Sequence, residues 1–310
     1  MDIKHVKPLL LTELDRRKFI STATKAAGAA VLLNSPLMTL AGNFAAGSKT
    51  ITVGEIMDAF ISEVPGAPFP ETVDTLKAGN RDIKVTGIVT SMFATLEVIQ
   101  KTIALDANFI IAHEPTYYNH ADETSWLENN EVYLYKTELL KQHQIAIWRN
   151  HDYIHRHIPD GVLSAVVARL GWTSFYNVSD SIAVLPAIQL KALIQHAKQK
   201  LDIDMVRYIG DLGQSCKKIL LMPGAAGGKR QIEVMNKVQP DVLLCGELQE
   251  WETAEYVRDA QTRGQQLSLV VLGHIASEEP GSEYMADWLL KKIPGIHVTH
   301  VPARNSLSFL

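Results

Sequence analysis

Cysteine and blocks of like charge are both scarce in this sequence. Its 310 residues include two cysteines, Cys216 and Cys245, so a framework of several disulfides is excluded and a single bond stays open. Both cysteines lie in apolar runs, which favours two buried small side chains over a disulfide. Charged residues make up 21% of the chain and the net charge is −4. The composition therefore gives no indication of a nucleic-acid partner.

Long hydrophobic runs are also missing, and the apolar stretch near the start is short. Residues 15–20 contain Arg16 and Arg17 in a pattern that resembles the twin-arginine consensus of bacterial Tat export signals. The apolar residues 26–33 that follow are far fewer than the ~20 needed to span a bilayer, and small residues follow over 41–47. We expect residues 1–47 to be a Tat signal peptide of a periplasmic or otherwise exported protein without stable membrane insertion. The alternative is an amphipathic surface helix.

Residues 48–310 alternate between helical and strand-like patterns. Such alternation predicts an α/β fold with largely parallel sheets, divided into an N-terminal lobe over about 48–172 and a C-terminal lobe over about 187–310. The predicted strands cover residues 84–90, 108–112, 145–148, 205–208, 218–222, 241–245, 267–272 and 297–301. The predicted helices cover residues 51–64, 95–104, 132–142, 161–170, 190–201, 231–238, 253–262 and 282–291.

A glycine-rich turn over residues 223–228 follows one predicted strand and precedes a helix. This context is that of a phosphate-binding loop, but the residues match neither the dinucleotide-binding pattern nor the P-loop. The simpler interpretation is a tight turn that lets the backbone pass close to a site.

Polar side chains follow three of the predicted strands, where ligand sites of open α/β sheets gather. Histidine and carboxylate together suit Zn, Mn, Fe or Co better than Mg or Ca. One such pair is weak evidence, but three clusters at strand ends predict a metal site. The clusters are His113-Glu114, His151 with His155, and His274 with Glu278.

These clusters resemble motifs of the NIF three-like family, often described as GTP cyclohydrolase 1 type 2. Residues 107–115, ANFIIAHEP, resemble the family's ADLIITHHP. Residues 241–247, DVLLCGE, resemble DAFITGE, and residues 273–278, GHIASE, resemble GHYATE. Residues 151–155 occupy the place of the family's HTNLD segment. The resemblance covers most of the chain after residue 52.

The resemblance implies two α/β lobes, a metal site in the cleft between them, two divalent ions per chain and a toroidal homohexamer. It also implies that His113 and His274 bind metal and that Glu278 touches both ions. Two positions depart from the family pattern: Glu114 replaces a histidine and His155 replaces an aspartate. The expected ligands remain three imidazoles and two carboxylates, because the two departures exchange one ligand type for the other.

The expected function is a metal-dependent hydrolase that acts on a small, polar, oxygen-rich substrate. Glu247, which matches a site-lining glutamate of the family, is the first candidate for general acid/base catalysis, and His151 is the second. GTP is not the expected substrate, since an exported protein would rarely meet it. The alternative is a non-catalytic metal-binding or metal-storage protein of the cell envelope.

Overall fold

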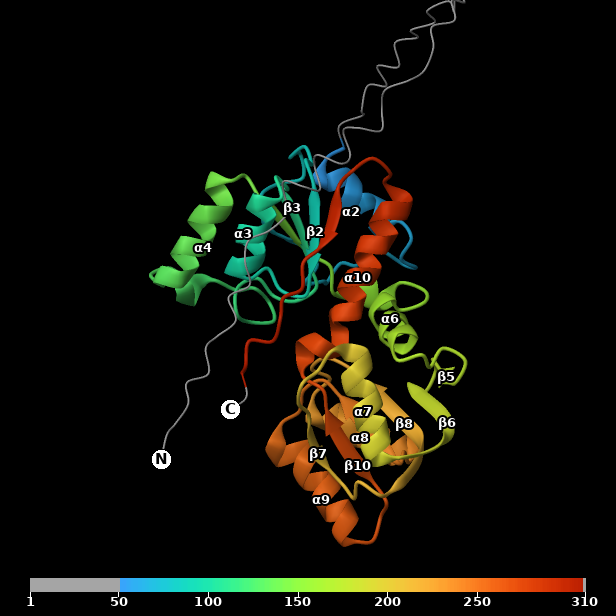
Figure 1. Cartoon of the computed structure of the whole chain (residues 1–310). Coiled ribbons are helices and arrows are strands. Elements are labelled where there is room, and N and C mark those ends of the chain that lie inside the picture. The colour runs from blue at the N-terminus through green and yellow to red at the C-terminus, as the bar shows by residue number, and fades with distance from the viewer. Residues whose placement is uncertain (1–50, 309–310) are drawn as a thin grey trace, which may run out of the picture. The chain divides into compact units, whose positions relative to one another are not determined.

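The computed structural model describes residues 51–308, and the predicted export signal lies outside these residues. Two sheets with helices on their faces make up the described part, which confirms the predicted α/β fold (Figure 1). Helices and strands are labelled as in Figure 1. No helix within residues 51–308 has both the length and the apolarity needed to cross a membrane.

The first sheet has the strand order β1-β4-β3-β2-β11. The strands β4, β3, β2 and β11 run parallel, and the edge strand β1 pairs antiparallel with β4. Every residue of β2, β3 and β4 is buried, as expected for parallel strands that are covered on both faces. The strands are β1 (Leu76–Ala78), β2 (Ile88–Ser91), β3 (Phe109–Ala112), β4 (Ala146–Arg149) and β11 (Val298–His300).

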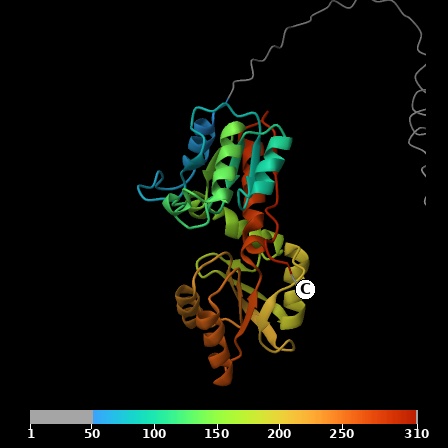
Figure 2. The same cartoon turned by 90° about the vertical axis from the view of Figure 1, so that its left-hand side faces the viewer.

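Helices cover both faces of this sheet (Figure 2). Phe109 and Ile111 of β3 pack in the cluster that contains α2 and α10, whereas Ile110 between them packs in the cluster of α3 and α4. This alternation is the two-residue period of a strand. The helices are α2 (Val53–Ile61), α3 (Leu96–Ala104), η1 (Ser125–Leu127), α4 (Glu131–Gln142), α5 (Asp152–Arg156) and α6 (Gly161–Arg169).

The second sheet has the strand order β5-β6-β8-β9-β10-β7, with a parallel centre and antiparallel edges. Leu220 and Leu243 pack towards α8 and α9, while Leu221 and Leu244 pack into the core that includes α7. The strands are β5 (Tyr176–Asn177), β6 (Ile182–Gln189), β7 (Arg207–Ile209), β8 (Ser215–Met222), β9 (Val242–Cys245) and β10 (Ser268–Val271). The helices are α7 (Leu190–Leu201), α8 (Gly228–Val238), η2 (Glu250–Ala254) and α9 (Glu255–Thr262).

Helix α10 (His274–Lys292) leads from the second sheet to the first. It follows β10, packs on α6 and β2, and is followed by β11 of the first sheet. The sequence predicted this helix to begin at Ser282, because Pro280 and Gly281 usually interrupt helices. Packing overrides that tendency: a Cβ on Gly281 would lie only 2.7 Å from Val162 of α6, so glycine allows the two helices to approach.

Two segments differ from the predicted division into lobes: residues 172–187 and the last strand, β11. The stretch between residues 172 and 187, expected to be a connection, contains β5 and the first half of β6, which pair at the edge of the second sheet. The last strand, β11, was expected in the second lobe but pairs with β2 of the first sheet. The long α10 explains this return, because it carries the chain across before β11 begins.

Both cysteines are buried and free. Cys216 lies on β8 and Cys245 on the neighbouring β9. Burial raises the pKa of the Cys216 thiol to about 11 and that of Cys245 to about 12, so neither is a ready thiolate.

Candidate metal centre

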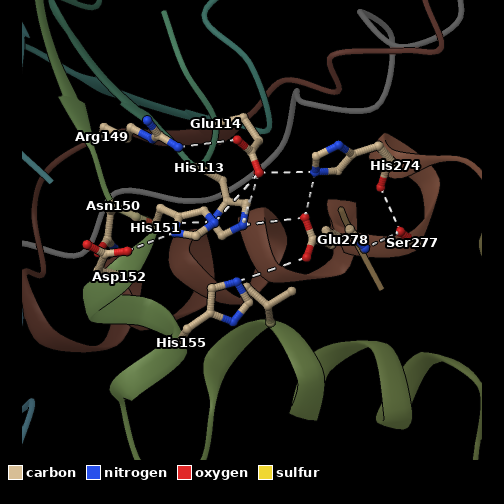
Figure 3. A network of polar contacts seen from close by, with 12 residues as sticks. His113, Glu114, Arg149, Asn150, His151, Asp152, His155, His274, Ser277 and Glu278 are labelled. Carbon is tan, nitrogen blue, oxygen red and sulfur yellow. Dashed lines mark hydrogen bonds and ion pairs between the residues drawn. The ribbon is translucent and has the colours of Figure 1, made fainter. Parts of the chain in front are cut away.

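Polar side chains from both sheets meet near the start of α10 (Figure 3). His113 and Glu114 follow β3 directly, and residues 150–152 lead from β4 into α5. His274 and Glu278 are one turn apart on α10 and therefore face the same side. Because β3 and β4 are parallel, their carboxyl ends bring these groups to one edge of the first sheet.

Three imidazoles form the first part of the cluster. The ring centroid of His113 lies 4.8 Å from that of His151 and 5.1 Å from that of His155, and the last two are 5.0 Å apart. One nitrogen of each ring lies within 4.8 Å of a nitrogen of the other two. The three rings therefore present a compact set of possible ligand atoms.

An oxygen acceptor holds the Nδ1 atom of each of these rings. The acceptors are the Asn150 backbone carbonyl for His113 (3.3 Å), Asp152 for His151 (3.0 Å) and Asp160 for His155 (3.0 Å). Such oxygens have no proton to give, so each Nδ1 is the donor and each Nε2 points away from that partner. The Nε2 atom of His113 is buried and has no hydrogen-bond partner among the described residues. This pattern is typical of histidines oriented for metal binding.

Glu278 lies at the centre of the second part of the cluster. Its Oε2 atom is 3.0 Å from Nε2 of His274 and 3.6 Å from Nε2 of His113, while its Oε1 atom is 4.0 Å from Nε2 of His155. Glu114 approaches the same His274 nitrogen, with Oε1 at 3.0 Å. His113, Glu114 and Glu278 also have ligand atoms that lie within 4.8 Å of one another. Glu278 thus faces both parts of the cluster.

Negative charge dominates the surroundings of His274. Burial alone lowers the pKa of His274, but its three carboxylate neighbours outweigh burial and raise the pKa to about 12. For Glu114 and Glu278, burial by itself raises the pKa. The nearby imidazoles outweigh burial and hold both pKa values below the ordinary value. The carboxylates are therefore ionised at neutral pH, and a cation would stabilise them.

His151 has the opposite electrostatic setting. Burial and the neighbouring His113 lower its pKa to about 4, so its imidazole is neutral at physiological pH. A neutral imidazole with a free Nε2 can bind a metal, whereas it makes a weak general acid. This places His151 in the group of possible ligands, although the sequence analysis assigned it a catalytic role.

Arg149 explains why a carboxylate suits position 114. The Arg149 side chain is fully buried at the end of β4 and lies 3.4 Å from Oε2 of Glu114 and 3.5 Å from Asp122. A buried guanidinium needs carboxylate partners, since an unpaired buried charge is costly. A histidine at position 114 would leave Asp122 as the carboxylate neighbour of Arg149, beside the His120 carbonyl to which Arg149 also donates.

Glu247 borders the cluster from the second sheet. Its Oε1 atom lies 2.8 Å from Nδ1 of His274, and its side chain is 54% exposed. The hydrogen bond from His274 holds the pKa of Glu247 below the ordinary value. Glu247 therefore orients His274 and is ionised at neutral pH, which allows it to accept a proton.

The glycine-rich turn passes directly over the cluster. Gly224 has φ +64°, and a Cβ there would lie 2.3 Å from Oε1 of Glu278, so no side chain fits. Its N–H group donates to Ser277 of α10. A Cβ on Gly228, at the start of α8, would lie 1.9 Å from a carboxylate oxygen of Glu252. A carboxylate already occupies that helix start, so the geometry agrees with the tight turn and not with a phosphate-binding loop.

A cavity of about 900 Å³ opens beside the cluster, a size that accepts a small molecule. Glu114, Glu247 and His274 contribute to its wall. Phe93 and Leu96 are among the apolar residues of the wall, which also contains polar side chains. The carboxylate part of the cluster is thus open to a ligand.

The structure brings the six predicted histidines and carboxylates of the strand-end clusters together, and their roles as ligands stay a prediction. The groups that orient or neutralise these side chains were not predicted from the sequence; they are Arg149, Asp152, Asp160 and Asp122. A charged residue at the end of the apolar run 145–148 was the available signal for Arg149. Asp160 gave no such signal, because it reaches His155 only through the turn between α5 and α6.

Comparison with known proteins identifies the family. Residues 71–306 match the sequence profile of Duf34/NIF3 (NGG1p interacting factor 3), which is more than half of the chain. The chain belongs to this family. Two relatives with the name "GTP cyclohydrolase 1 type 2 homolog" are similar to it. The one from Clostridium acetobutylicum is 24% identical over 232 residues, 71% of this chain and 81% of the relative. The one from Clostridium perfringens is 23% identical over 216 residues, 66% and 78% of the two chains.

Solved structures share the Duf34/NIF3 fold of this chain. A hypothetical protein of Staphylococcus aureus has a TM-score of 0.67 at 20% identity and covers 84% of this chain and 99% of its own. A Bacillus cereus protein related to NIF3 has a TM-score of 0.68 at 17% identity, with 85% and 100% covered. At these identities the likeness concerns the fold alone.

Proposed function

We propose that this Duf34/NIF3 protein is a metal-dependent hydrolase with a dinuclear centre for divalent ions. The observation that carries the proposal is Glu278, whose carboxylate oxygens reach both ligand groups. Oε1 lies 4.0 Å from Nε2 of His155, whereas Oε2 lies 3.0 Å from Nε2 of His274 and 3.6 Å from Nε2 of His113. A carboxylate that contacts two ligand groups can serve both ions of a two-metal site.

The residues fit two ions in donor type as well as in position. His113, His151 and His155 would hold one ion, and Glu114, His274 and Glu278 would hold the other, with Glu278 in reach of both groups. Mixed imidazole and carboxylate donors favour Zn, Fe, Mn or Co. The buried Nε2 of His113 has no hydrogen-bond partner within residues 51–308, which supports metal binding, because a buried polar atom needs a partner.

Two bound divalent ions would activate water and stabilise negative charge on a substrate oxygen. The chain's own contribution to proton transfer is Glu247, which lies at the cavity wall in its ionised form. His274 holds its Oε1 atom, and within residues 51–308 its Oε2 atom has no hydrogen-bond partner. We assign Glu247 as the general base, acting through this free oxygen.

Metal content tests the first part of the proposal. Protein purified without chelator should contain about two equivalents of transition metal per chain by elemental analysis, and His274→Ala should lose most of one or both. His143→Ala is the matched control, since His143 is exposed at the end of α4. Protein without metal, or a His274→Ala variant with full metal content, would overturn the dinuclear centre.

Turnover tests the second part. Metal-loaded protein should be screened on phosphoesters, cyclic amidines and nucleotides, with GTP included because of the two Clostridium relatives. Glu247→Gln should keep the metal and lower turnover by about 10²–10⁴, the usual scale for loss of a general base. A protein that binds two ions but hydrolyses none of these compounds would favour the metal-storage function instead.

We further propose export through the Tat pathway and assembly into a homohexamer. Arg16 and Arg17 support the first proposal, and family membership supports the second. Light scattering on the purified chain gives the assembly size directly, and a monomer would contradict the hexamer.

A further inference from the structure

A lysine is buried on the inner side of α4. Lys136 is 3% exposed, whereas Val132, Leu134 and Tyr135 of the same helix are each about half exposed. Its Nζ atom donates a hydrogen bond of 2.7 Å to the backbone carbonyl of Thr116. Lysine is rarely buried without a partner of opposite charge, so this inverted arrangement needs an explanation.

No carboxylate pairs with Lys136 among the described residues. Asp122 is its acidic neighbour, but Oδ1 of Asp122 accepts from the backbone N–H groups of Thr116 and Tyr117. Oδ2 of Asp122 faces Lys77 at 3.3 Å and Arg149 at 3.5 Å. The Lys136 ammonium therefore has no ion-pair partner within residues 51–308.

Two of its three N–H groups also lack a hydrogen-bond acceptor within residues 51–308. The ammonium lies 5.7 Å from the ring centroid of Tyr117 and 5.5 Å from that of Tyr118. These aromatic faces give weak support to a cation, but they leave the two donors available.

Lys136 lines the cavity beside the metal cluster. The same cavity reaches Glu114, Glu247 and His274, and the other permanent cation in its wall is the exposed Arg304. Thr116, which holds the ammonium, is two residues from Glu114, and two extended residues span at most about 7 Å. Because Lys136, Glu114 and His274 line one cavity, a small molecule there can contact Lys136 and the cluster together.

The charge state of Lys136 decides what it can bind. Burial lowers its pKa to about 8, which is still above neutral pH. The side chain is thus mostly an ammonium at pH 7, which attracts anions and is a poor nucleophile.

We propose that Lys136 binds an oxyanion group, a phosphate or a carboxylate, of the small molecule that occupies this cavity. One part of the inference rests on the proposed function: that another group of the same molecule reacts at the metal cluster. The substrate class is then an anionic small molecule with an apolar or aromatic part, which packs on Phe93 and Leu96. Arg304 at the rim would add to the attraction.

Calorimetric titration of the full chain with inorganic phosphate, and separately with acetate, tests the proposal. Lys136→Met should weaken binding of the preferred anion by about tenfold or more, as expected for a lost charge-assisted hydrogen bond. Lys141→Met, at an exposed position of the same helix, should bind as the wild type does. The anion that binds with the higher affinity identifies the group that the substrate carries. Equal affinities of the wild type and Lys136→Met, or no binding of either anion, would overturn the proposal.

A measurement on the wild type covers the case in which Lys136→Met does not fold. Acetic anhydride acylates neutral amines, and peptide mass spectrometry measures the modified fraction of Lys136 and Lys141 in one sample. Phosphate or acetate should protect Lys136 and leave Lys141 unchanged; an unprotected Lys136 would refute the proposal.

The two proposals fail separately. In the His274→Ala background, with reduced metal content, Lys136→Met should still lower the anion affinity. If anion binding depends on His274 alone, the anion is a metal ligand and the assignment to Lys136 is wrong, whereas the metal centre stands.

Discussion

Replacing Lys136 by methionine should stabilise the folded chain at neutral pH, although the residue is buried. Burial lowers the pKa of Lys136 from 10.5 to about 8. Each pKa unit corresponds to about 1.4 kcal/mol, so the buried ammonium costs the folded state about 3 kcal/mol below pH 8. Methionine keeps the apolar stem and removes this cost.

The lost hydrogen bond to Thr116 offsets part of the gain. A hydrogen bond from a charged donor contributes about 1.5–3 kcal/mol, which leaves a net increase of about 1 kcal/mol in the free energy of unfolding. Most core substitutions of comparable burial destabilise by about 0.5–3 kcal/mol. An increase in the free energy of unfolding is therefore unusual for a core substitution, and we expect it only if the Lys136 ammonium is unpaired.

The pH dependence gives a second, independent signature. Between pH 8 and about 10.5 the unfolded chain binds more protons at this site than the folded chain does, so the stability of the wild type rises with pH. The variant lacks this rise, and its advantage should disappear across that window. Urea denaturation of the wild type, Lys136→Met and the control Lys141→Met, each at pH 7 and pH 10, measures both effects.

Two results would refute this reasoning. One is a loss of more than about 1 kcal/mol at pH 7 in Lys136→Met with Lys141→Met unchanged. The other is a difference between wild type and variant that stays constant with pH. Either would mean that the protein itself stabilises the Lys136 ammonium, which would remove the need for an anionic ligand.

Three further predictions concern the cluster and the export signal. Glu278→Gln keeps the side-chain volume but removes the carboxylate that faces both ligand groups, so elemental analysis should show both ions reduced, and full retention of one ion would contradict the bridging role. Glu114→His should weaken metal binding measured with a chelating indicator, and adding His155→Asp should restore part of it; purely additive effects would exclude an exchange between the two positions. Arg16→Lys combined with Arg17→Lys should leave the precursor in the cytoplasm, and an unchanged periplasmic fraction would refute the Tat signal.

Local patterns were sufficient to predict most strands and the cluster at their ends. The runs that become β3 and β4 are apolar without interruption, because both faces of the sheet are covered, and each run ends in polar residues. Parallel strands place these ends at one edge, so His113 and His151 had to lie close together. The start of α10 was missed because the tolerance of Pro280 and Gly281 depends on the contact with α6.

Other features depend on partners that are distant in sequence. The carboxylate at position 114 looked like an exchange with His155, but the structure shows that Arg149 contacts it directly. Lys136 of α4 is buried, whereas its apolar neighbours Leu134 and Tyr135 are about half exposed, which is the reverse of the usual preference. The helix turns Lys136 inward, because its ammonium donates to the loop that follows β3. Neither contact can be predicted from the residues next to it in the sequence.

Because of the position of α10, a metal ion at this site would also affect the stability of the fold. His274 meets Glu114 across 160 residues of sequence. An ion held by both would close a very long loop, and such a link restricts the unfolded chain much as a disulfide does. The two cysteines are free and buried, so they provide no covalent equivalent. A bound ion would thus act as a reversible cross-link between the two sheets. We expect the resistance of the protein to proteases and heat to increase with the metal concentration.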